Sequence, residues 1–293
     1  MATVSWTFPI NGDWSDSGNW TPTGPGPGDD AVIGATPGSY IVSVTGATFV
    51  HSVSLAASGA TLAVGSALTI GALPTVVTPG TLSVTAGTVR LAAGGSIIGG
   101  PNGGTIAVNG GSVVFAGGTL NGVTWLSPLT MTGSNAALTL TGSVAVTGTA
   151  GVTVAGLNDS LTVLGTLATS AGLSINAGSV QVWNGGHAAI GASSTSEATF
   201  ELHNGADASV NGDYVNNGML AVDAGNGESN SSLTVTGTLT NNKTVQAGNS
   251  GGTKLILGGL VNPSGKNFTF TLGTLSFTGG PLAFTQNGGA FCP

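Results

Sequence analysis

The fold is decided by a phrase that reads Gly80-Thr81-Leu82-Ser83-Val84-Thr85-Ala86-Gly87-Thr88-Val89-Arg90-Leu91. Apolar and polar residues alternate in its first half, small residues interrupt the pattern, and the alternation then resumes. A period of two places Leu82 and Val84 on one face of a strand and Ser83 on the other face. Glycine permits the bend between the two halves because it has no side chain. The phrase therefore predicts two short strands joined by a tight turn.

The same phrase recurs along most of the chain. Variants with Gly-Thr before an apolar residue start at Gly104, Gly165, Gly237 and Gly273. Comparable apolar strands begin near Leu62, Leu82, Ile106, Leu138, Leu161, Val180, Phe200, Leu220, Leu233 and Leu255. A sandwich or barrel also has many short strands, but it seldom repeats one phrase at near-regular intervals. We therefore predict an all-β, parallel β-solenoid (β-helix) with rungs of roughly twenty residues, in which stacked coils bury one continuous core.

The alternation also predicts which residues lie inside. We expect the core to contain Leu82, Val84, Ile106, Val108, Leu138, Leu140, Leu161, Val163, Leu220, Val222, Leu255 and Leu257. Their neighbours should point outward, namely Ser83, Ala107, Thr139, Thr162, Ala221 and Ile256.

The composition excludes several classes of partner. Charged residues make up 5% of the chain, whereas a typical globular domain has about 25%. The net charge is -7, and the positive residues are Arg90, Lys243, Lys254 and Lys266. Nucleic-acid binding and membrane-surface binding both need a basic patch. No apolar run approaches the roughly twenty residues of a membrane helix, so we expect neither a nucleic-acid partner nor membrane insertion.

The N-terminal segment differs from the repeats. It contains Trp6 and the runs Gly12-Asp13-Trp14, Asn19-Trp20 and Pro27-Gly28-Asp29-Asp30. This segment resembles the opening of repetitive bacterial surface β-solenoid proteins, the autotransporter-like and large adhesin-like passenger domains, in which such a run precedes the first coil. The resemblance implies an extracellular or cell-surface β-solenoid and names no ligand.

Composition suggests three parts of one domain. We assign residues 1–40 to an N-terminal capping segment, 41–286 to the β-solenoid array and 287–293 to a C-terminal tail. Asparagine beside glycine suits turns, because it tolerates a left-handed backbone. The repeated pairs Asn216-Asn217 and Asn241-Asn242 further predict asparagine ladders between coils.

Catalysis is the first functional class to weigh, because parallel β-helices include polysaccharide lyases and glycoside hydrolases. Glycoside hydrolysis usually needs two carboxylates at close range. The candidate acids are Glu197, Glu201, Asp207, Asp213, Asp223 and Glu228, of which Glu201 and Asp223 lie about one rung apart and could share a face. The simpler interpretation is that acids keep a nearly uncharged surface soluble. We expect no enzymatic activity and no catalytic residue.

Metal binding is the second class. His51, His187 and His203 are scattered, but Glu201 lies two residues before His203 on the same strand face. That pair could bind a metal, although an exposed polar pair is the simpler interpretation. Calcium could use the acids of the loop-rich N-terminal segment, which are Asp13, Asp16, Asp29 and Asp30. Turn capping by Asp13 and Asp29 is favoured over calcium, so no cofactor is expected.

Self-association is the third class. A solenoid exposes an unpaired strand edge at each end, and the ends of this chain are rich in aromatic residues. We expect head-to-tail stacking into a surface fibre through Trp6, Trp14, Trp20, Phe268, Phe270, Phe277 and Phe284. The expected function is a non-enzymatic extracellular structural or adhesive protein, with a glycan or cell-surface receptor as a further partner. The alternative is a secreted carbohydrate-binding or carbohydrate-cleaving β-helix, similar to lyases or tailspikes. Ice binding by Thr-x-Thr runs is less favoured, because the runs lack one fixed spacing.

Overall fold

In the computed structural model of the protein, the chain divides into two compact units. The first comprises Met1–Ser127 with Ala136–Ala145, and the second comprises Pro128–Asn135 with Val146–Pro293. The structure describes residues 2–71, 80–101, 103–249 and 251–279, and the backbone of strands at 284–286 and 290–292. Both units are parallel β-solenoids, which confirms the predicted fold class. The helix assigned in the described ranges is one 3-10 turn, Ser17–Asn19, and no described helix is long and apolar enough to cross a membrane.

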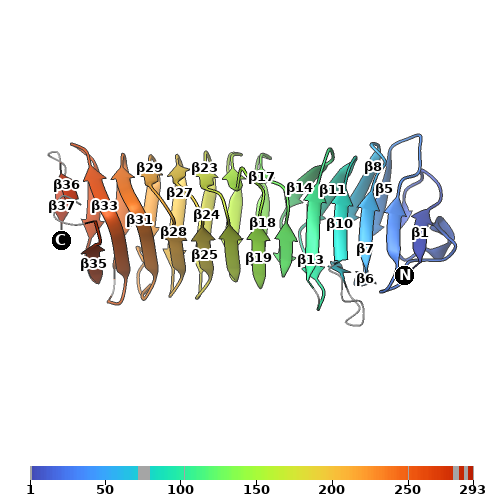
Figure 1. Cartoon of the computed structure of the whole chain (residues 1–293), viewed down its shortest axis with the longest axis horizontal. Coiled ribbons are helices and arrows are strands. Elements are labelled where there is room, and N and C mark those ends of the chain that lie inside the picture. The colour runs from blue at the N-terminus through green and yellow to red at the C-terminus, as the bar shows by residue number, and fades with distance from the viewer. Residues whose placement is uncertain are drawn as a thin grey trace. The chain divides into compact units, whose positions relative to one another are not determined.

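The first unit is built from three rows of parallel strands (Figure 1). One row contains β1 (Thr3–Trp6), β4 (Asp30–Ile33), β7 (Ser52–Leu55), β10 (Gly80–Val84), β13 (Gly104–Val108) and β16 (Val123–Trp125). The next contains β2 (Gly12–Asp13), β5 (Tyr40–Val44), β8 (Ala60–Val64), β11 (Thr88–Ala92) and β14 (Ser112–Ala116). The last contains β6 (Thr48–Val50), β9 (Ala67–Ile70), β12 (Ser96–Gly99), β15 (Gly118–Asn121) and β18 (Ala137–Thr141). The short strand β3 (Trp20–Thr21) differs, because it pairs antiparallel with β1.

The second unit repeats this arrangement. One row contains β22 (Thr166–Thr169), β25 (His187–Ile190), β28 (Asp207–Val210), β31 (Ser232–Asn241), β33 (Lys254–Asn262) and β35 (Thr274–Phe277). The next contains β17 (Leu129–Met131), β20 (Val152–Val154), β23 (Leu173–Ile175), β26 (Ser194–Ser196), β29 (Tyr214–Asn216), the ends of β31 and β33, and β36 (Phe284–Gln286). The last contains β21 (Ser160–Val163), β24 (Ser179–Trp183), β27 (Thr199–His203), β30 (Met219–Val222), β32 (Thr244–Ala247), β34 (Asn267–Phe270) and β37 (Ala290–Cys292). One further strand, β19 (Ser143–Val146), has its last residue in this unit.

Equivalent residues of successive coils stack into ranks. In the row from β21 to β34, one inward rank is Leu161, Val180, Phe200, Leu220, Val245 and Phe268, and every member is buried. The adjacent outward rank is Thr162, Gln181, Glu201, Ala221, Gln246 and Thr269. Burial of a Leu, Val or Phe side chain contributes about 1.5–3 kcal/mol each. These ranks hold the coils together and fix which side chains face outward.

The predicted core is buried except at Val108, and one outward residue, Ala221, is buried as well. Val108 is half-buried, because the next strand of its row, β16, ends opposite Ile106 and leaves Val108 covered from one side only. Ala221 belongs to the outward rank as expected, yet it is only 2% exposed. Its methyl group is too short to reach solvent between the longer side chains of Glu201 and Gln246. Ala221 therefore points outward as predicted, but its neighbours cover it.

Asparagine has the two roles that the sequence predicts. Asn158, Asn184 and Asn204 have positive φ values in turns. The inward residues Asn216 and Asn241 are joined by side-chain hydrogen bonds in a ladder that continues to Asn262.

The ladder runs through the buried end of the second row. The Asn216 amide donates to Asn241 Oδ1 at 3.0 Å, and the Asn241 amide donates to Asn262 Oδ1 at 2.8 Å. A parallel outer ladder joins Asn242 to Asn217 and Asn217 to Glu197. Both ladders pair amide groups from coil to coil, although the inner ladder leaves Asn216 Oδ1 buried without a hydrogen-bond partner.

Candidate functional site

The acids and the histidine of the central repeats meet at the end of β27. Strand alternation places Glu201 outward, beside Gln181 of β24, whose amide donates to Glu201 Oε2 at 2.6 Å. His203 follows two residues later, and its ring stacks on Trp183 with the centroids 3.8 Å apart and an interplanar angle of 16°. We call Gln181, Trp183, Glu201, His203 and Glu228 the His203 cluster.

His203 lies between two carboxylates. Its Nδ1 is 2.8 Å from Glu228 Oε1, and its Nε2 is 3.6 Å from Glu201 Oε2. The residue is only 9% exposed, so the expectation of an exposed polar pair was wrong. The loop that follows β30 brings Glu228 against the imidazole, and Glu228 is fixed in turn by the Gly225 N–H, 2.9 Å from its Oε2. The contact between Glu228 and His203 could not be predicted from strand alternation, because Glu228 lies in a loop.

Asp223 is sealed inside the protein. It accepts hydrogen bonds from Asn204 N, Ser231 N, Ser231 Oγ and Thr253 Oγ1 at 2.7–3.1 Å. Its φ of 49° turns the chain away from the strand direction, so it does not share an open face with Glu201. A carboxylate with four donors and no exposed surface has a structural role here.

The other acidic candidates lie apart from the His203 cluster in the hydrogen-bond pattern. Glu197 accepts from the Asn217 side chain, and Asp213 accepts from Thr238 N. Asp207 is exposed on β28. The structure therefore brings only Glu201 and Glu228 together, on either side of the same imidazole.

A Ser, a His and an Asp also meet in the first unit. His51 Nδ1 is 2.8 Å from Asp30 Oδ1 and 3.2 Å from Ser52 Oγ. Nucleophilic activation needs the serine and the acid on different ring nitrogens, so that the ring can accept from one side and donate to the other. Both contacts here use Nδ1, and Ser52 Oγ also accepts from Thr81 N. This group is a structural hydrogen-bond network and has the wrong geometry for a catalytic triad.

The four N-terminal acids act mainly on their own turns. Asp13 accepts from the N–H and hydroxyl of Ser15, and these bonds and a bond from the Thr45 hydroxyl lower its pKa. Asp29 accepts from Gly26 N and Ala2 N, which lower its pKa.

Asp16 and Asp30 also have local partners. Asp16 caps the 3-10 turn through Gly18 N, and Asp30 contacts His51. Across the described ranges, no three His, Cys, Asp or Glu side chains are grouped so that they could hold one ion. The four acids that were candidates for calcium are thus placed in separate local contacts.

Most of the aromatic residues expected at a subunit contact belong to the core of the chain itself. Trp6, Trp14 and Trp20 are buried, with Trp20 packed edge-on against both other indoles. Phe268 and Phe270 are buried too, whereas Phe277 is 36% exposed. The side chain of Phe284 lies outside the described residues. Stacking through the five buried rings would therefore require the chain to open.

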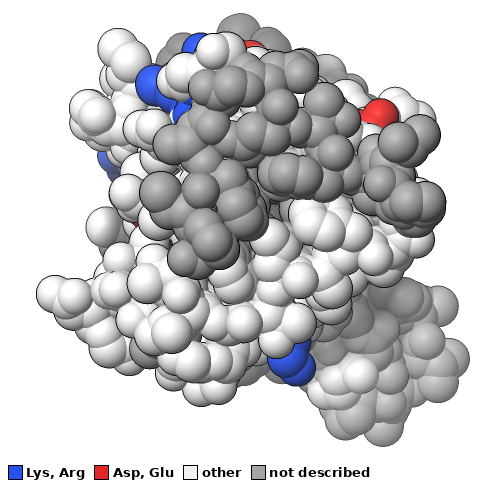
Figure 2. Space-filling model, turned by 90° about the vertical axis from the view of Figure 1, so that its left-hand side faces the viewer, with Lys and Arg blue, Asp and Glu red and all other residues white. Residues whose placement is uncertain are grey.

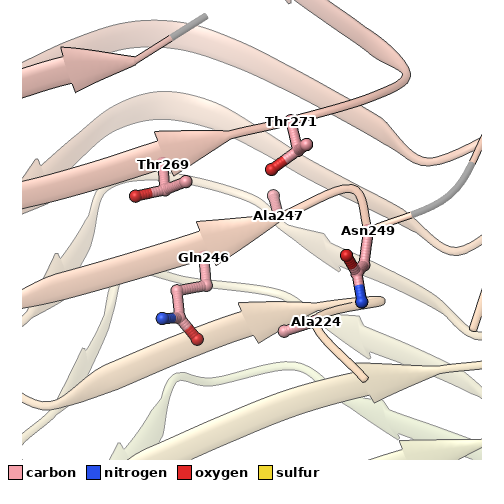
Figure 3. A pocket seen from close by; sticks show the side chains of 6 residues that line it. All are labelled: Ala224, Gln246, Ala247, Asn249, Thr269 and Thr271. Atoms are coloured by element: carbon pink, nitrogen blue, oxygen red, sulfur yellow. The ribbon is translucent and has the colours of Figure 1, made fainter. Parts of the chain in front are cut away.

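The described surface contains pockets in both units. One, of about 140 Å³, is lined by Ala224, Gln246, Ala247, Asn249, Thr269 and Thr271 (Figure 3). Gln246 and Thr269 continue the outward rank of Glu201, and they come from the neighbouring strands β32 and β34. Another, of about 340 Å³, is lined by Trp14, Ser15, Gly24, Pro25, Gly26, Pro27, Ala47, Thr48 and Phe49. Neither pocket is lined by a charged side chain.

Comparison of the chain with protein-family models, with curated proteins and with solved structures gives no match. Function must therefore be argued from the site itself.

Proposed function

We propose that the protein is a non-enzymatic structural and adhesive β-solenoid of an extracellular or cell-surface assembly. The observation that carries this proposal is the pair of ranks in the row from β21 to β34. Every inward member is buried, and the outward members other than Glu201 are neutral. A repetitive, largely neutral outward rank of this kind suits contact with other chains.

Low charge supports association as part of this function. In the view of Figure 2, most described atoms belong to uncharged residues, and the Lys, Arg, Asp and Glu atoms that can be seen lie around the edge. Little electrostatic repulsion would oppose stacking of copies. Phe277 is the partly exposed aromatic residue on β35 and the contact residue that we propose for head-to-tail association.

Sedimentation velocity over a concentration series, combined with electron microscopy, tests this function. We expect assemblies that lengthen with concentration and shorten in Phe277→Ser. Trp14→Ser is the matched comparison, because it should disturb the buried indole cluster rather than a contact. A monomer at every concentration would refute the association, and turnover of any polysaccharide in a substrate panel would refute the non-enzymatic assignment.

A second candidate function is binding of a neutral carbohydrate at the N-terminal pocket. Two hydroxyl groups line this pocket, and each donates its proton within the protein: Ser15 to Asp13, and Thr48 to the Gly46 carbonyl. The Ser15 and Thr48 hydroxyl oxygens can therefore accept hydrogen bonds from a ligand. Exposed Phe49 adds an apolar face. A pyranose brings hydroxyl donors and an apolar C–H face, and the pocket volume falls in the usual range for small ligands. A neutral-glycan array should then give signals that Phe49→Ala removes, and a blank array would exclude this candidate.

A further inference from the structure

The imidazole of His203 has one ring nitrogen without a partner. Its Nε2 has essentially no exposed surface and accepts or donates no hydrogen bond. Burying such a group without a partner is unfavourable by about 1–3 kcal/mol. Nε2 lies beside the Glu201 carboxylate, and a positively charged ligand would interact favourably with both groups.

The contact of Nδ1 with Glu228 determines what kind of ligand Nε2 can bind. A glutamate carboxylate only accepts hydrogen bonds, so the short contact to Glu228 places a proton on Nδ1. In the neutral ring the lone pair is then on Nε2, and Glu201 Oε2 is the nearby carboxylate oxygen. Two acceptors therefore lie 3.6 Å apart. This separation is too long for an N–H···O hydrogen bond, which spans about 2.7–3.2 Å.

The same separation suits a metal ion. Zinc binds imidazole nitrogen at about 2.0–2.1 Å and carboxylate oxygen at about 2.0–2.2 Å, so two ligands of one tetrahedral zinc lie about 3.4 Å apart. A metal-ligating histidine commonly donates its second N–H to a carboxylate, which is the role that Glu228 has toward His203. Trp183 stacks on the ring, and Gln181 holds the Glu201 carboxylate.

The negative charge of Glu201 also favours a bound cation. Among the described residues, no lysine or arginine lies within ion-pair distance of Glu201. Its side chain is 19% exposed, compared with 11% for the side chain of His203, so Glu201 is the more accessible member of the pair.

We propose that His203 Nε2 and Glu201 bind a zinc-class divalent ion, with Glu228 orienting the imidazole. The chain supplies two ligands, because the described residues contain no group of three that could coordinate one ion. Water fills the remaining positions, and the affinity is accordingly below that of closed structural zinc sites. This proposal does not depend on the structural function proposed above.

Calorimetric titration of the chelator-treated full chain with zinc chloride near neutral pH tests the site. We expect saturable binding of one ion per chain. Glu201→Gln and His203→Gln should weaken it at least about tenfold, and Glu228→Gln about 10–100-fold, since outer-shell partners have effects of that size. His51→Gln is the control, because His51 has an equivalent Nδ1 contact to Asp30 in the other unit and should leave the titration unchanged.

Fluorescence gives a second measurement that does not depend on affinity alone. Zinc should change the emission of Trp183, and Trp183→Phe should lose that change while it still binds zinc. Circular dichroism confirms that each variant is folded. The proposal is overturned if the folded wild-type chain does not bind millimolar zinc, if Glu201→Gln binds as tightly as wild type, or if His51→Gln weakens binding equally.

Discussion

Asp223→Asn separates a structural carboxylate from a catalytic one. Each oxygen of Asp223 accepts one backbone N–H, Oδ1 from Asn204 and Oδ2 from Ser231. An asparagine has one acceptor oxygen and one NH₂ group, so in either orientation its NH₂ faces a backbone donor. The Ser231 and Thr253 hydroxyls can rotate to adapt, but a backbone N–H cannot. The left-handed backbone is no obstacle, because asparagine tolerates it.

The magnitude follows from these contacts. One hydrogen bond to a charged group is lost, at about 1.5–3 kcal/mol, and one buried N–H is left without an acceptor, at about 1–3 kcal/mol. We expect Asp223→Asn to lower the free energy of unfolding by about 3–5 kcal/mol, measured by urea unfolding with circular dichroism. Asp207→Asn, exposed on β28, should stay within about 0.5 kcal/mol of wild type. A loss below about 1 kcal/mol for Asp223→Asn would refute the argument from fixed donors.

Three further changes probe the core, the ladders and the N-terminal turns. Leu220→Ala should cost about 2–5 kcal/mol in urea unfolding, because Leu220 is fully buried in an inward rank; a cost below about 1 kcal/mol would contradict that packing. Asn241→Ala should cost about 2–4 kcal/mol by orphaning buried ladder groups, whereas Asn242→Ala, on the outer ladder, should cost less than about 1 kcal/mol; equal costs would contradict the assignment of faces. The lowered pKa values of Asp13 and Asp29 mean that their stabilisation is present above the ordinary aspartate pKa and is lost as pH falls through the lower folded-state values. Tryptophan fluorescence should therefore report loosening of the N-terminal segment in acid, and Asp29→Asn should diminish this pH dependence; an unchanged acid profile would exclude Asp29 as a contributor.

The solenoid could be predicted because its information is local and repeated. Alternation along Leu82, Ser83 and Val84 sets the faces, and recurrence of the phrase sets the stacking. Alternation did not predict how exposed Val108 and Ala221 are, because their exposure depends on the length of the next strand or the size of neighbours in a rank. The length of the next strand and the size of the neighbouring side chains are set by adjacent coils, so the sequence of one strand does not indicate them.

The candidate site was predictable only in part. The spacing of Glu201 and His203 placed them on one strand face. Glu228 joins them from a loop 25 residues further along the chain than His203, so no short motif could indicate it. The His203 imidazole is buried because that loop and Trp183 cover it. The two residues expected to form a surface pair therefore belong to a largely buried cluster.

Neighbouring asparagines illustrate why residue type alone does not decide role. Asn241 ends β31 facing inward, where each amide must find a partner because water is absent. Asn242 is the next residue and follows the strand at its half-buried outer edge, yet it joins a ladder of the same kind. A one-residue shift of register would exchange the two environments. The inward ladder opposes the shift that would put Thr240 in the place of Asn241, because a threonine hydroxyl cannot make both amide contacts to Asn216 and Asn262. The opposite shift would put Asn242 there, so the asparagine pair does not oppose it. A polar rank inside the core therefore disfavours one of the two register shifts, whereas an apolar rank of interchangeable Val and Leu would discriminate against neither.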